Sequence, residues 1–148
     1  MVSRQILQNI GTSWEDAQWY LKMGMKSMEE GAPNRVTVSI FCQALIRGAD
    51  CLCFYYNNES CKSGRGHGLH KPFQELYTRK GMPEKYSQYT STLKKWVAQE
   101  KDLAQYKGKN YNTTELGKAE KQTRRFLENC VKEVLKEEQV WKQIGTDT

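Results

Sequence analysis

Residues 35–56 read RVTVSIFCQALIRGADCLCFYY, and this stretch decides the fold of the chain. Its apolar side chains recur every three or four residues, which is the spacing of one face of an α-helix. The members of this face are Val38, Phe41, Cys42, Leu45, Ala49, Leu52 and Cys53. Ile40, Ile46 and Tyr56 widen the face over most of the circumference, which predicts a helix at the centre of the fold. The β-branched start VTVSI is also compatible with a strand, but no second strand is available to pair with it.

An amphipathic helix is predicted before this central helix. Thr12 or Ser13 is its expected cap, because Glu15 and Asp16 then occupy the first turn at the positive end of the helix dipole. The apolar stripe of this helix comprises Trp14, Ala17, Leu21, Met25 and Met28. The helix is expected to end at Gly31.

Three more helices are predicted after the central one. The third opens near Leu69 and ends at Gly81, and the fourth covers about residues 84–105. A long last helix follows, with Thr113 or Thr114 as its expected cap.

Neither a repeat nor a change in composition divides the chain, so residues 1–148 are expected to form a single all-α domain, an up-and-down bundle of about five helices. Lys and Arg together number 23 and Asp and Glu 17, giving a formal net charge of +6. This excess favours an acidic partner such as RNA or a nucleotide. No apolar run approaches the roughly 20 residues of a membrane span, and the N-terminus lacks the apolar region of a signal peptide. We therefore expect a cytoplasmic protein without a membrane partner.

Five cysteines are an odd number for a disulfide framework. Cys51 and Cys53 lie too close together in the sequence for a usual structural bridge, and Cys42 and Cys130 fall in apolar helical patterns. The sequence therefore predicts reduced cysteines that pack as small buried hydrophobic residues.

Both histidines of the chain lie in residues 63–76, SGRGHGLHKPFQEL, close to Arg65. Attack of an RNA 2′-OH on its phosphate requires a group that moves a proton near pH 7 and a fixed cation that holds the phosphate. His70 and Arg65 are side chains of these two kinds, and Asp50 in the central helix is a candidate to orient them. No metal ion or cofactor is needed for this chemistry.

Other interpretations of the same segment stay open. Lys62, Arg65 and the backbone amide of Gly66, with its neighbouring glycines, are suited to hold a phosphate without cleaving it. Four side chains near or in the segment have the atoms of a zinc site, although their spacing fits no usual zinc motif. They are Cys53, Cys61, His67 and His70. A solvated loop with both Arg65 and His70 exposed is the simplest alternative.

Three stretches of the chain are similar to sequences of the HEPN superfamily, which are small helical bundles linked to RNA cleavage and nucleotide binding. The first is IRGADCLCFYY in the central helix, which resembles the I-R-A-A-D-A-L pattern of that family. The second is RGHGLH, in which Arg65 precedes His70 with the Arg-to-His spacing of the family's active site. The third is AQYKGKNYNTTELGKAE, which leads into the last helix.

The resemblance implies a HEPN-like fold and a metal-independent endoribonuclease that is active as a homodimer, with Arg65 and His70 near the two-fold axis. It also implies a nucleotidyltransferase antitoxin as a partner and a toxin-like role. Gly66 follows the arginine where a polar residue is usual, and Pro72 occupies the position of a tyrosine in toxin-type members. These two residues favour the alternative, a non-catalytic HEPN module that binds a nucleotide or a protein.

Overall fold

The computed structural model describes residues 2–61 and 68–145, and every regular element in these ranges is helical. The elements are α1 (Arg4–Glu29), α2 (Asn34–Asn57), α3 (His70–Arg79), a 3₁₀ segment (Glu84–Tyr89), α4 (Thr90–Leu93), a π-helical segment (Lys94–Glu100), α5 (Lys101–Gln105), α6 (Thr113–Phe126), a second π-helical segment (Leu127–Val131), α7 (Lys132–Glu137) and α8 (Val140–Ile144). The elements from 84 to 105 follow one another without a break and are called the 84–105 helix below. Those from 113 to 137 are likewise called the 113–137 helix.

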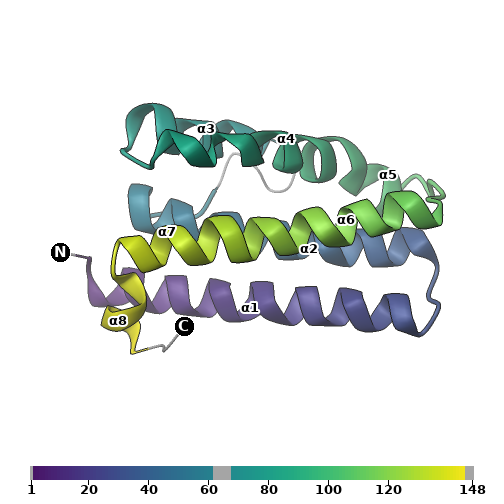
Figure 1. Cartoon of the computed structure of the whole chain (residues 1–148), viewed down its shortest axis with the longest axis horizontal. Helices are drawn as coiled ribbons and strands as arrows, with labels where there is room; N and C mark the ends of the chain where they lie inside the picture. Colours follow the sequence, from purple (N-terminus) through teal and green to yellow (C-terminus); the bar gives the residue numbers. More distant parts are fainter. Residues whose placement is uncertain (1, 62–67, 146–148) are drawn as a thin grey trace.

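The helices form a bundle, as the sequence predicts (Figure 1). Helix α1 lies along one edge, α2 and the 113–137 helix lie in the middle, and α3 and the 84–105 helix lie along the opposite edge. Helix α2 contacts α1, α3, α5 and α6, which confirms that it is the central helix. The prediction of about five helices is close, because the described residues add only the short α8, which turns back against α1.

The first helix begins much earlier than the sequence analysis predicted. Ser3 is its N-cap, with a side-chain oxygen that accepts a hydrogen bond from the Ile6 amide at 3.2 Å. Thr12 and Ser13 therefore lie inside α1. Gly11 also lies inside α1, where an added Cβ atom would be 3.6 Å from Cγ2 of Ile144 in α8.

The cap of the last long helix was also assigned to the wrong residue. Asn112 caps α6 and forms a capping box with Glu115, in which each side chain bonds the other residue's backbone amide at 2.8 and 3.0 Å. Thr113 and Thr114 are the first two residues of the helix itself. Gly31 and Gly81 follow the ends of α1 and α3, as predicted. Both glycines have a positive φ, which is the backbone conformation that often terminates a helix.

Helix α2 is long and apolar enough to cross a membrane by length and composition, contrary to the expectation that no segment passes this test. In the structure, 72% of its most apolar window is buried inside the bundle. Phe41, Leu45 and Leu52 are at most 1% exposed and form part of the central core. Its position in the core accounts for its composition.

Candidate functional site

The residues predicted to bind and cleave RNA fall into two groups in the structure. Lys62, Arg65 and Gly66 lie outside the described residues. His70 and Asp50 lie inside them, on α3 and α2. The residues directly before and directly after 62–67 are described, and on both sides the chain is fixed to the core.

The N-terminal flank is held at Cys61, which is 7% exposed. A disulfide joins it to Cys53 in the last turns of α2, eight residues earlier. The amide of Cys61 also donates a hydrogen bond of 3.0 Å to Oδ1 of Asp50. Helix α2 ends at Asn57, and the left-handed backbone of its C-cap, Asn58, reverses the chain toward this anchor.

Asp50 therefore helps to anchor the chain at Cys61. It is 8% exposed, and its second oxygen lies 4.0 Å from Nη1 of Arg47. Burial raises the pKa of Asp50, while the Cys61 amide and Arg47 act in the opposite direction. Within the described ranges, no hydrogen bond joins Asp50 to His70, so its predicted role in orienting the histidine stays a prediction.

The C-terminal flank is held at Leu69 and Phe73, which are 1% and 0% exposed. His70 lies between them, as the first residue of α3. Its Nδ1 atom is buried and has no hydrogen-bond partner among residues 2–61 and 68–145. Burial lowers the pKa of His70, and the nearby ammonium groups of Lys94 and Lys71 lower it further.

A lowered pKa means that the His70 imidazole is mostly neutral at pH 7 and can accept a proton. The two lysines add positive charge beside this imidazole. Lys94 was not singled out from the sequence as a neighbour of His70, because 24 positions separate the two residues and no local pattern connects them.

The prediction that the cysteines are reduced and buried is correct for three of them and wrong for the other two. Cys42, Cys51 and Cys130 are free and buried, as predicted. Cys53 and Cys61 are bonded to each other, so the prediction of five reduced cysteines was wrong. It failed because the partner of Cys53 is the cysteine beyond the end of α2, which the reversal at Asn58 brings back to the helix. Such a bond is typical of oxidising compartments and does not favour the predicted cytoplasmic location.

The disulfide also bears on the zinc alternative, because it occupies the two sulfur atoms of Cys53 and Cys61. Residues 2–61 and 68–145 contain no group of three His, Cys, Asp or Glu side chains placed to hold a metal ion. His67 lies outside the described residues.

No protein-family model matches this chain, and neither does any curated protein or solved structure. The resemblance to HEPN proteins accordingly depends on the three stretches quoted from the sequence.

Proposed function

We propose that this bundle is a HEPN-type domain that binds RNA and cleaves it without a metal ion at residues 62–70. His70 carries the proposal, because its neutral imidazole begins a helix beside two lysines and directly follows the segment that contains Arg65. The anchors at Cys61 and Leu69 support it as well. They hold the ends of the segment that has to position the reacting groups.

The proposed reaction is attack of a ribose 2′-oxygen on the adjacent phosphorus. The O2′–P bond forms, the P–O5′ bond breaks, and the proton of the 2′-OH passes to Nε2 of His70. The departing 5′-oxygen takes a proton from water. Arg65 pairs with the phosphate oxygens, and Lys94 and Lys71 add to the positive potential around them.

The alternative is a non-catalytic module that binds RNA or a nucleotide. One observation favours it: within the described residues, no side chain accepts or donates a hydrogen bond at Nδ1 of His70. Catalytic histidines are usually oriented through the second ring nitrogen. Gly66 and Pro72 point the same way.

RNA cleavage in the presence of EDTA separates these two functions. We expect the purified chain to cleave single-stranded RNA, and His70→Ala and Arg65→Ala each to lower the rate by about 100-fold or more. Gln74→Ala, an exposed change on the same helix, serves as the control and should retain full activity. Because the neutral imidazole is the active form, the rate should fall as pH drops through the pKa of His70, which burial and the two lysines hold below the ordinary value for histidine. Bound RNA that stays intact with the folded wild type would establish the non-catalytic module.

The proposal includes a homodimer and a nucleotidyltransferase partner, which are properties that the HEPN resemblance implies. Sedimentation equilibrium at micromolar concentration tests the first directly. A monomer would remove the shared two-fold site from the proposal while leaving RNA binding open to test.

A further inference from the structure

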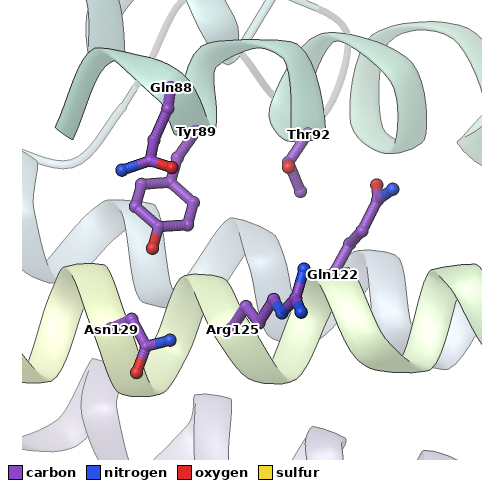
Figure 2. A pocket seen from close by; sticks show the side chains of 6 residues that line it. All are labelled: Gln88, Tyr89, Thr92, Gln122, Arg125 and Asn129. Atoms are coloured by element: carbon purple, nitrogen blue, oxygen red, sulfur yellow. The ribbon is translucent and has the colours of Figure 1, made fainter.

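A polar pocket lies between the 84–105 helix and the 113–137 helix, and neither His70 nor Asp50 is among the residues that line it. Its volume is about 420 Å³, within the size range of small-molecule sites. Figure 2 shows six side chains converging on it, three from each helix. The lining residues are Gln88, Tyr89, Thr92, Gln122, Arg125 and Asn129.

The pocket is bounded at both ends by hydrogen bonds that connect the same two helices. At one end, Nε1 of the buried Trp96 donates to Oε1 of Gln122 at 2.7 Å. Toward the other end, Tyr86 and Lys85 donate to Oε1 of Glu137 at 2.9 and 3.2 Å. These bonds fix the separation of the helices on either side of the pocket.

The inner wall is also fixed. The ring of Tyr89 packs edge-on against the buried ring of Phe126, with 6.0 Å between the centroids. Gln122 is already held by Trp96, which leaves its amide nitrogen free to donate into the pocket. Asn129 comes from the π-helical segment Leu127–Val131, and such segments occur frequently at functional sites.

Arg125 is the charged residue of this pocket. Its guanidinium group points between the two helices, toward the side on which Thr92 and Gln122 lie (Figure 2). Within the described part of the chain, it has neither an ion-pair nor a hydrogen-bond partner. Its neighbour Arg124 differs, since it pairs with Glu120 at 3.2 Å.

These groups define the chemistry of a ligand. An unpaired guanidinium group binds a phosphate through two parallel hydrogen bonds. Side-chain amides both donate and accept, which matches the edges of unpaired nucleobases. No carboxylate lines the pocket, so nothing within it repels an anion.

We propose that the polar pocket binds a phosphorylated nucleoside, either a free nucleotide or an unpaired nucleotide of an RNA strand. Arg125 holds the phosphate, and Asn129, Gln88 and Gln122 bond the base or the ribose. This deepens the proposed RNA-binding function by giving it a second contact point. The pocket is nevertheless independent of His70 and of cleavage.

Equilibrium binding to the full-length protein tests the proposal. The probes are AMP and UMP, measured by calorimetry, and a fluorescently labelled single-stranded RNA, measured by anisotropy. We expect Arg125→Ala to weaken binding by about tenfold or more. The matched control is Arg124→Ala, which removes the same charge one position away and should change affinity by less than about twofold. Thermal unfolding of each variant confirms that it is folded.

The outcomes separate the sources of the ligand and the two proposals. Loss of AMP or UMP binding in Arg125→Ala would identify a free-nucleotide site, and loss of RNA binding alone would identify a subsite for a strand. Equal weakening by Arg124→Ala and Arg125→Ala would indicate non-specific attraction and overturn the pocket, as would no binding of any probe at millimolar concentration. Loss of cleavage in His70→Ala and loss of AMP or UMP binding in Arg125→Ala are separate measurements, so failure of cleavage and failure of the pocket give different results.

Discussion

Around Gly24 and Phe41, helices α1 and α2 are in close apolar contact, whereas around the polar pocket the 84–105 and 113–137 helices meet through polar side chains. Gly24 of α1 lies so close to Phe41 of α2 that a Cβ atom there would be 2.4 Å from the ring. In the second interface, hydrogen bonds from Trp96 and Tyr86 hold the helices at the two ends of the polar pocket. The contact between Gly24 and Phe41 leaves no space for another atom, and close packing of this kind stabilises the fold. The second interface leaves space bounded by fixed groups, which is what a binding site requires.

The largest expected effect is loss of packing in the α1–α2 interface. Phe41 is 1% exposed, so Phe41→Ala should leave a cavity and lower the free energy of unfolding by about 3–5 kcal/mol. Gln88→Ala in the polar pocket should change it by less than about 0.5 kcal/mol. Urea denaturation measures both. Similar losses from the two variants would mean that the pocket is as important for stability as the close-packed interface.

The Cys53–Cys61 disulfide should have the next largest effect. Its bond closes a short loop, and the chain-entropy model assigns about 2.5 kcal/mol to a loop of that size. The double variant Cys53→Ala, Cys61→Ala should lose about this much stability. A thiol reductant should lower the thermal midpoint of the wild type but leave that of the double variant unchanged. A wild type insensitive to the reductant would show that the bond does not contribute.

Overfilling the close contact between α1 and α2 should have a smaller cost. Gly24→Ala gains helix propensity but forces the Phe41 ring to move, for a net loss of about 1–2 kcal/mol. Gly117→Ala on α6 is the control, because nothing lies within 4 Å of the added methyl group. That control should gain up to about 1 kcal/mol. If both variants are stabilised, the α1–α2 contact is looser than described.

The smallest expected effect is a pH-dependent loss of stability on removing the hydrogen bond between Tyr86 and Glu137, near the polar pocket. The hydrogen bond from Tyr86, together with Lys85, lowers the pKa of Glu137 below its ordinary value of about 4.3. A lowered carboxyl pKa stabilises the fold above the ordinary pKa, and this stabilisation is lost as pH falls through the lowered one. Tyr86→Phe should therefore be slightly less stable than the wild type at pH 7. The difference in the free energy of unfolding should become smaller as the pH is lowered.

Tyr77→Phe is the control for this titration, since its hydroxyl bonds that of Thr90, which does not titrate. Its difference from the wild type should be the same at every pH. Acid unfolding followed by circular dichroism measures both variants. A constant difference for Tyr86→Phe would contradict the role given to Glu137.

The elements that the sequence predicted well are those with a strong local signal. Residues 35–56 were predicted to be the central helix, and α2 spans Asn34–Asn57. The helix ends at Gly31 and Gly81 were also predictable, because a glycine with a positive φ is a local property of the chain. The start of α1 was missed because Ser3 offers the same capping chemistry as Thr12 and Ser13, and only packing of the first turns selects it.

In the candidate site, too, some features follow from local sequence patterns and others only from tertiary contacts. The sequence alone determined an all-helical chain with one dominant apolar helix and singled out His70, because helical periodicity and side-chain chemistry are properties of short segments. Only the tertiary structure brought Cys53 to Cys61, Lys94 toward His70, and Arg125 into one pocket with Gln88, Tyr89 and Thr92. Chain reversals and helix packing decide such contacts, and no pattern within one segment records which other segment will lie beside it.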